Sequence, residues 1–165
     1  MNFSGISYES FADGEGVRVS LFVSGCRRHC KGCFNTDAQS FNYGEQFNSD
    51  VINVIMEHLK KPYIAGITFL GGEPMEPENV FGLIDLAQEV RNAGKTVWVY
   101  SGFTYEEILN YPAQRRLLSL CDVLVDGSFI EEQRDITLAF RGSRNQRIID
   151  VQKSLESGTV VLWNI

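Results

Sequence analysis

The 165-residue sequence contains no apolar run near the roughly 20 residues that span a bilayer. Residues 1–11 contain neither the basic nor the apolar segment of a secretory signal peptide. An excess of basic charge is also missing, since the net charge is −6. These absences argue against a membrane protein, an exported protein and a binder of nucleic acid or anionic lipid. We therefore expect a cytoplasmic chain.

Repeats, low-complexity tracts and long linkers rich in proline, glycine or serine are absent as well. Hydrophobic residues make up 44% of the sequence and charged residues 22%, which is ordinary globular composition. A chain of this length is typical of one domain. The sequence therefore predicts a single domain over residues 1–165.

Apolar segments rich in β-branched and aromatic residues predict six strands. They cover residues 17–23, 66–70, 96–100, 123–125, 147–151 and 159–163. Helical periodicity separates the first four, with apolar stripes over 51–59 and 80–90 and a capping box at Thr104 before a helix that Pro112 interrupts or restarts. This alternation predicts an α/β fold of right-handed βαβ units around a parallel sheet.

Two architectures fit a sheet of about five to six mostly parallel strands, a partial (β/α) barrel and a doubly wound open sheet. A complete (β/α)8 barrel typically needs about 250 residues. The last two predicted strands could form a hairpin around Ser157 and Gly158 instead of another crossover. In either architecture chemistry belongs at the carboxyl ends of the strands, where the connecting loops meet.

Polar and glycine-rich segments follow the first four predicted strands at this common rim. In chain order they are residues 24–35 with three cysteines, Gly71-Gly72-Glu73-Pro74, Ser101-Gly102 and Asp126-Gly127. Their coincidence at one edge of the sheet predicts a functional site there.

Three of the four cysteines, Cys26, Cys30 and Cys33, have the spacing C-x3-C-x2-C. In a reducing compartment such a group is more often a metal site than a disulfide framework. A [4Fe-4S] cluster ordinarily takes four cysteine ligands, so three would leave one iron open to another ligand. The alternative is structural zinc, with His29 or Cys121 as the fourth ligand. A second C-x2-C pair is missing, and Cys121 is expected to be an inert core thiol.

Basic side chains surround these cysteines in a chain that is acidic overall. They are Arg27, Arg28, His29 and Lys31. Their positive charge would favour thiolates, offset the negative charge of a cluster and guide an acidic electron donor. His29 itself is expected to be an exposed loop residue.

The cysteine spacing and the glycine turn together resemble the radical S-adenosylmethionine (SAM) superfamily. More narrowly, five segments resemble the family of activating proteins of the anaerobic ribonucleoside-triphosphate reductase. They are residues 13–18, 21–26, 30–35, 123–127 and 141–146. In the superfamily an aromatic residue often precedes the last cysteine, whereas here Gly32 precedes it and Phe34 follows it. The reductase activators share this arrangement.

The resemblance implies a partial barrel of radical SAM type and an oxidoreductase activity. Cys26, Cys30 and Cys33 would hold one [4Fe-4S] cluster, whose remaining iron would be chelated by the amino and carboxylate groups of SAM. The reduced cluster would cleave SAM to methionine and a 5′-deoxyadenosyl radical. That radical would remove a hydrogen atom from a glycine in the C-terminal loop of the large reductase subunit. A small electron-donor protein such as a flavodoxin would supply the electron.

The resemblance also implies the residues that contact SAM. Gly71 and Gly72 would let the backbone approach the methionine moiety, and Glu73 would lie near its ammonium group. The alternative for this segment is an ordinary strand-to-helix turn. The full set of implied SAM contacts is Gly32, Cys33, Phe34, Gly71, Gly72, Glu73, Ser101 and Asp126.

Two other functions fit parts of the sequence. The first is a radical SAM enzyme that activates a different glycyl-radical enzyme or acts on a small molecule. The second, from another class, is a zinc-stabilised interaction module without catalysis. Metal and acid-labile sulfide analysis separates the zinc module from both iron–sulfur functions.

Overall fold

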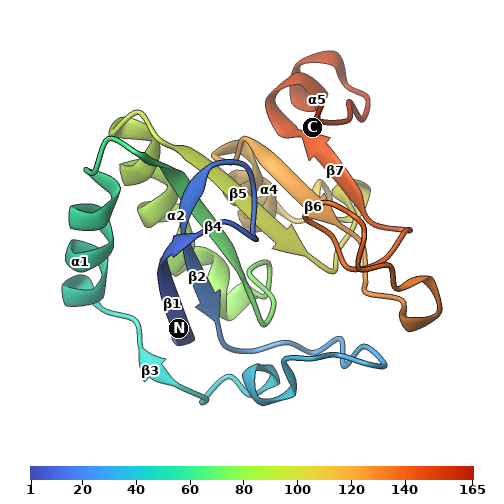
Figure 1. Ribbon diagram of the computed structural model, residues 1–165, viewed down its shortest axis with the longest axis horizontal. Helices are drawn as coiled ribbons and strands as arrows, with labels where there is room; N and C mark the ends of the chain where they lie inside the picture. Colours follow the sequence, from blue (N-terminus) through green and yellow to red (C-terminus); the bar gives the residue numbers. More distant parts are fainter.

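The computed structural model describes residues 1–165 as one seven-stranded sheet with helices packed against it (Figure 1). The strands are β1 (Asn2–Ser10), β2 (Val17–Val23), β3 (Glu45–Gln46), β4 (Ile64–Gly71), β5 (Thr96–Ser101), β6 (Val123–Asp126) and β7 (Arg147–Asp150). The helices are α1 (Ser49–Leu59), α2 (Pro77–Asn92), α3 (Tyr105–Ile108), α4 (Pro112–Ser119) and α5 (Val151–Ser157), with 3-10 turns η1 (Thr36–Gln39) and η2 (Glu131–Gln133). No helix combines the length and apolar character needed to cross a membrane.

The four central strands, β2, β4, β5 and β6, are parallel and lie in the sheet in chain order. Right-handed crossovers that all advance in one direction place their helices on one face of the sheet. Accordingly, side chains of α1, α2 and α4 form one core with a single face of these strands. A doubly wound sheet needs a reversal of strand order, so that predicted architecture is wrong.

The prediction of five or six mostly parallel strands is also wrong in number, because β1 and β3 were not expected. The strand β1 pairs antiparallel with β2, and β3 pairs antiparallel with β1. Register shifts interrupt β1, and most of its residues are half-exposed. The sequence of β1, NFSGISYES, lacks the continuous apolar run that marks the central strands, and for this reason it was not expected to be a strand.

The C-terminal segment differs from the predicted strand over 159–163. The chain leaves β7, which is antiparallel to β6, directly into α5, where the side chain of Asp150 accepts a hydrogen bond from the Lys153 N–H. Gly158 ends α5 with φ +76°. The following tail forms only an isolated bridge between Leu162 and Ile149. Asp150 and Gly158 thus cap a helix that separates β7 from this tail.

The predicted helices are confirmed. The side chain of Asn48 caps α1 by accepting a hydrogen bond from the Val51 N–H. Thr104 and Glu107 form the predicted capping box of α3, and Pro112 starts α4 instead of breaking a longer helix. Proline fits this position because the first helical N–H needs no partner within the helix.

The sheet face opposite these helices carries side chains in layers that cross the strands. Pairing aligns Arg18 with Gly66 and Thr96, and the next layer contains Ser20, Thr68, Trp98 and Val123. The layer at the carboxyl ends contains Phe22, Leu70, Tyr100 and Val125.

Arg18 fills the first of these layers and is 1% exposed. Its guanidinium donates to the hydroxyls of Thr68 (2.9 Å) and Thr96 (3.0 Å) and lies 5.5 Å from the ring centroid of Trp98. A buried guanidinium is tolerated here because its donors find acceptors. This end of the sheet is therefore filled by protein, and open space remains at the carboxyl ends.

Candidate functional site

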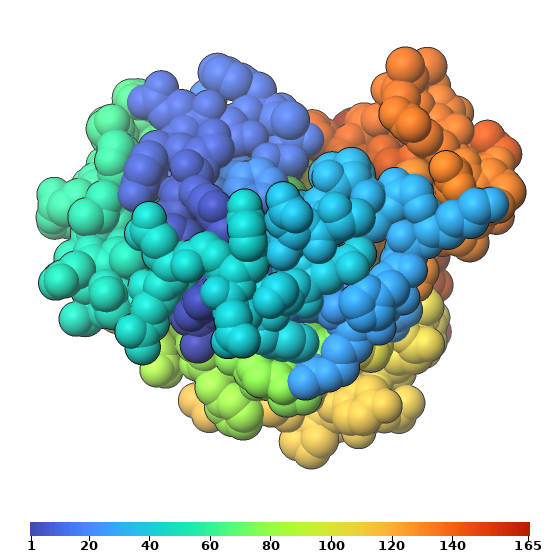
Figure 2. Space-filling model, turned by 90° about the horizontal axis from the view of Figure 1, so that it is seen from below, coloured from blue at the N-terminus to red at the C-terminus, as the bar shows by residue number.

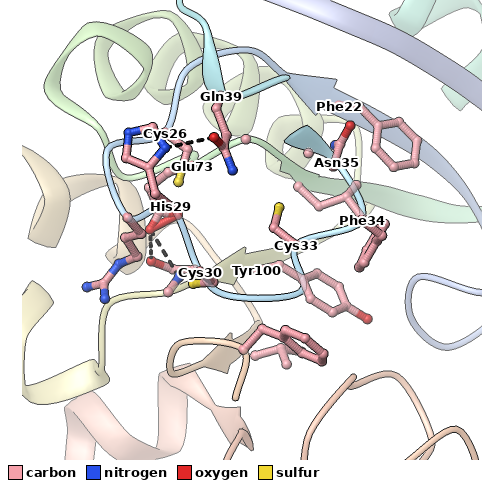
Figure 3. A pocket seen from close by; sticks show the side chains of 18 of the residues that line it. Phe22, Cys26, His29, Cys30, Cys33, Phe34, Asn35, Gln39, Glu73 and Tyr100 are labelled. Atoms are coloured by element: carbon pink, nitrogen blue, oxygen red, sulfur yellow. Dashed lines mark hydrogen bonds between the residues drawn. The ribbon is translucent and has the colours of Figure 1, made fainter. Parts of the chain in front are cut away.

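A pocket lies at the carboxyl ends of the parallel strands (Figure 3). The layer formed by Phe22, Leu70, Tyr100 and Val125 is its floor. Its walls come from the cysteine loop, the turn after β4 and the segments that follow β5 and β6. The structure therefore brings residues from all four predicted loops into one pocket, with Gly127 representing the fourth loop.

Cys26, Cys30 and Cys33 all line this pocket as free, partly exposed thiols. Their sulfur atoms are arranged around a common space in Figure 3. No three histidine, cysteine or carboxylate side chains are grouped closely enough to coordinate a single ion. A [4Fe-4S] cluster binds its thiolates at separate iron atoms, so its ligands lie farther apart than those of one ion. Three thiols around a shared space fit such a cluster.

The start of the cysteine loop is fixed by backbone contacts. The Gly25 N–H donates to the Ala38 carbonyl at 2.7 Å, and the Cys26 N–H donates to the Gln39 carbonyl at 3.0 Å. Gly25 has φ +104°, and a Cβ there would lie 2.1 Å from the ring of Phe41. Only glycine fits this position. Burial raises the pKa of the Cys26 thiol above its ordinary value.

Gly71 and Gly72 line the pocket, and the structure gives a packing reason for both glycines. A Cβ on Gly71, where φ is +108°, would lie 2.7 Å from the backbone nitrogen and oxygen of Val23. A Cβ on Gly72 would lie 2.7 Å from the Gly25 carbonyl. The turn after β4 thus packs directly on β2 and the cysteine loop, which agrees with its interpretation as a tight strand-to-helix turn.

Glu73 is the buried carboxylate of the pocket, with 2% exposure. Its Oε1 accepts hydrogen bonds from the Ser101 hydroxyl (2.5 Å) and the Gly102 N–H (3.1 Å). Burial raises the pKa of Glu73 to about 7, although these hydrogen bonds act in the opposite direction. Ser101 also lines the pocket, and its hydroxyl is directed at Glu73.

Asp126 is 1% exposed and does not line the pocket. Its carboxylate accepts a hydrogen bond from the Tyr105 N–H at 2.8 Å and pairs with the Arg147 guanidinium at 3.0 and 2.6 Å. These contacts tie β6 to the start of α3 and to β7. Asp126 therefore stabilises the wall behind the pocket.

The two remaining predicted residues of the cysteine loop differ in position. Phe34 lies on the pocket rim and is 92% exposed, so it is not part of the core. Gly32 does not line the pocket; it has φ +77°, and a Cβ there would lie 2.9 Å from the Glu131 side chain. The loop tip thus packs on η2, as Figure 2 shows where the blue segment meets the orange one.

The expected excess of positive charge around the cysteines is wrong, because carboxylates from distant segments pair with these cations. His29 is exposed, as predicted, and its Nδ1 lies 2.7 Å from Gln39 Oε1. The ion pairs join Arg27 to Glu76 and Glu78, Arg28 to Glu107, and Lys31 to Glu131 and Glu132.

Several pocket residues were not predicted. The four floor residues were assigned only to strands, although every second strand residue faces the same side and this period could have identified them. Phe129 and Gln146 come from the long connection between β6 and β7, whose path no local pattern indicates.

Residues 12–149 match the family model described as a 4Fe-4S single cluster domain. The chain is 42% identical over 140 residues to the anaerobic ribonucleoside-triphosphate reductase-activating protein of Haemophilus influenzae, an alignment that covers 82% of this chain and 89% of that protein. Proteins of the same name from Escherichia coli and Enterobacteria phage T4 are 36% and 35% identical over 150 residues, covering 88% and 90% of this chain and 96% and 93% of theirs. The chain therefore belongs to the family of anaerobic ribonucleoside-triphosphate reductase-activating proteins.

Proposed function

We propose that this chain is an iron–sulfur activase that cleaves SAM reductively and generates a glycyl radical on the anaerobic ribonucleoside-triphosphate reductase. The observation that carries the proposal is a single pocket lined by three free thiols and by the Gly71-Gly72-Glu73 turn. The family match and the names of the relatives support the cluster and the partner.

The three thiols of the loop would each bind one iron of the cluster, and the fourth iron would be left for SAM. Cys121 cannot complete the set, because it is buried in the core with its Sγ 3.3 Å from the Leu117 carbonyl. Burial also raises the pKa of the Cys121 thiol far above its ordinary value. When bound and reduced, the cluster supplies the electron that splits SAM into methionine and the 5′-deoxyadenosyl radical, which takes a hydrogen atom from glycine.

Glu73 would accept hydrogen bonds from the SAM ammonium group. Ser101 and the Gly102 N–H hold Glu73 Oε1, so the orientation of the carboxylate is set before a ligand arrives. The positive charge of the ammonium would favour the carboxylate form of Glu73 and lower its raised pKa. Ser101 acts in this scheme as a positioning residue.

The other implied SAM contacts divide by position. Phe34, on the pocket rim, offers a flat face for the adenine ring. Cys33 lines the pocket itself. Gly32 and Asp126 do not line it, so they would affect SAM binding only by positioning their neighbours Cys33 and Gly127, which do. The apolar floor would keep water away from the radical.

The partner implied by this function is the large reductase subunit, whose C-terminal glycyl loop would enter the pocket past the rim. A small donor protein such as a flavodoxin would reduce the cluster. Activation of a different glycyl-radical enzyme remains the alternative substrate assignment. Assays of radical formation on each candidate enzyme separate these partners.

The proposal is tested with the anaerobically reconstituted and reduced protein. We expect an electron paramagnetic resonance (EPR) signal of a reduced cubane that changes when SAM is added. Zinc without acid-labile sulfide, and no such signal, would overturn the proposal in favour of the zinc module.

Cysteine variants test the ligand set. Cys30→Ala should lose SAM cleavage and the native EPR signal while the protein stays folded. Cys121→Ala is the matched control and should retain both, because this thiol lies in the core. Unchanged SAM cleavage in Cys30→Ala would refute the ligand assignment.

A further inference from the structure

The cysteine loop is attached to the start of α2 through Arg27. Its backbone N–H donates to Glu76 Oε1 at 3.2 Å, and its guanidinium contacts Glu76 Oε2. The same guanidinium donates to Glu78 at 3.0 and 2.5 Å. One side chain next to Cys26 therefore joins two carboxylates of a different segment.

These two carboxylates differ in environment. The Glu76 side chain is 5% exposed, whereas the Glu78 side chain is 45% exposed. A charge removed from water interacts more strongly with its surroundings than one screened by solvent. Of the two carboxylates that pair with Arg27, Glu76 is therefore the one whose charge acts more strongly on its surroundings.

Phe41 holds the other side of this attachment. The Arg27 guanidinium carbon lies 4.4 Å from the ring centroid of Phe41, and the same ring occupies the space beside Gly25. The segment from Gly25 to Arg27 is thus held between Phe41 and α2. The loop tip has weaker attachments, since Lys31 reaches Glu131 and Glu132 only at 3.7 and 3.3 Å with exposed side chains.

We propose that Arg27 and Glu76 are positioning residues of the iron–sulfur site: together they fix Cys26 against α2, and their opposite charges set the reduction potential of the cluster held there. This inference rests on the proposed cluster at Cys26, Cys30 and Cys33. Net charge close to a cluster is one of the factors that determine its potential. A buried carboxylate alone would make the cluster harder to reduce, and Arg27 offsets that effect.

The test compares single and double variants of the reconstituted holoprotein. Glu76→Gln removes the negative charge but leaves the positive charge of Arg27, so the reduction potential of the cluster should rise. The glutamine keeps a side-chain oxygen that can still accept the hydrogen bond from the Arg27 backbone N–H. Arg27→Gln leaves the buried negative charge, so the potential should fall. The double variant removes both charges and should return to near the wild-type potential. EPR-monitored redox titration measures each value, with iron and sulfide content determined alongside.

Glu78→Gln is the matched control, because it makes the same chemical change to the exposed partner of the same guanidinium. The reduction potential of the cluster in Glu78→Gln should shift less from the wild-type value than in Glu76→Gln. If both single variants lose the cluster, retention by the double variant at the wild-type potential supports the pairing. Three results would overturn the pairing: loss of the cluster from both single variants and the double variant, shifts of the reduction potential in the same direction in the two single variants, or potentials unchanged from wild type. A wild-type protein that forms no cluster would refute the proposed function instead.

Discussion

The Ser101 hydroxyl donates a 2.5 Å hydrogen bond to Oε1 of Glu73, a carboxylate that is 2% exposed. The two residues come from the carboxyl ends of neighbouring parallel strands, β5 and β4. Burial raises the pKa of Glu73 to about 7, and the hydrogen bond from Ser101 opposes that rise. The charge state of the pocket near neutral pH therefore depends on this contact.

Ser101→Ala should shift the pH dependence of SAM binding upward. Without the hydroxyl, the Glu73 carboxylate loses a stabilising donor, so its pKa rises above about 7 and less carboxylate is present at neutral pH. We expect SAM affinity at pH 7 to fall several-fold and to recover at higher pH, measured by equilibrium binding to the reconstituted protein. Ser101→Thr should restore the wild-type profile, and Ser119→Ala, at an exposed site, should leave it unchanged.

Glu73→Gln should alter the pH dependence of stability. The pKa of Glu73 in the folded protein, about 7, is above the ordinary value of 4.5. The folded state therefore binds the proton more tightly, so this contribution is complete below about pH 4.5 and is lost as pH rises through 7. The loss amounts to at most roughly 3 kcal/mol. Urea unfolding of the metal-free proteins at several pH values should show a smaller decline for Glu73→Gln, and parallel curves would contradict this assignment.

Gly71→Ala should destabilise the protein by roughly 1–3 kcal/mol or more, because it combines a strained positive φ with a collision against the Val23 backbone. Gly5→Ala is the control, since a Cβ there meets no atom within 4 Å. That variant should stay within about 0.5 kcal/mol of wild type. Chemical denaturation measures both. Equal stability of the two variants would refute the packing reason for Gly71.

Arg147→Gln should destabilise the protein by roughly 3 kcal/mol, since it leaves the 1% exposed Asp126 without its cation. Lys60→Gln removes one partner of a solvent-exposed pair with Glu57 and should change stability much less. Thermal or urea unfolding compares the two.

In Asp126→Asn, SAM affinity within about twofold of wild type would agree with a structural contact, whereas a large loss would place Asp126 in the SAM site.

The sequence by itself determined the central features of the fold and the site. Long apolar strands alternating with amphipathic helices specify a parallel sheet, and the capping residues Thr104 and Pro112 mark helix boundaries correctly. The spacing of three cysteines and the position of Gly71-Gly72-Glu73 after a strand located the pocket. These signals are local, because a few adjacent residues fix both the backbone conformation and the chemistry.

Tertiary structure alone decided the electrostatics and the edges of the fold. Arg27 meets Glu76 from 49 residues away, and Arg28 meets Ser128 from 100 residues away. The raised pKa of Glu73 and the pairing of Asp126 with Arg147 likewise depend on burial and on distant strands. Local patterns carry no record of such contacts, since desolvation and ion pairing arise only when remote segments pack together.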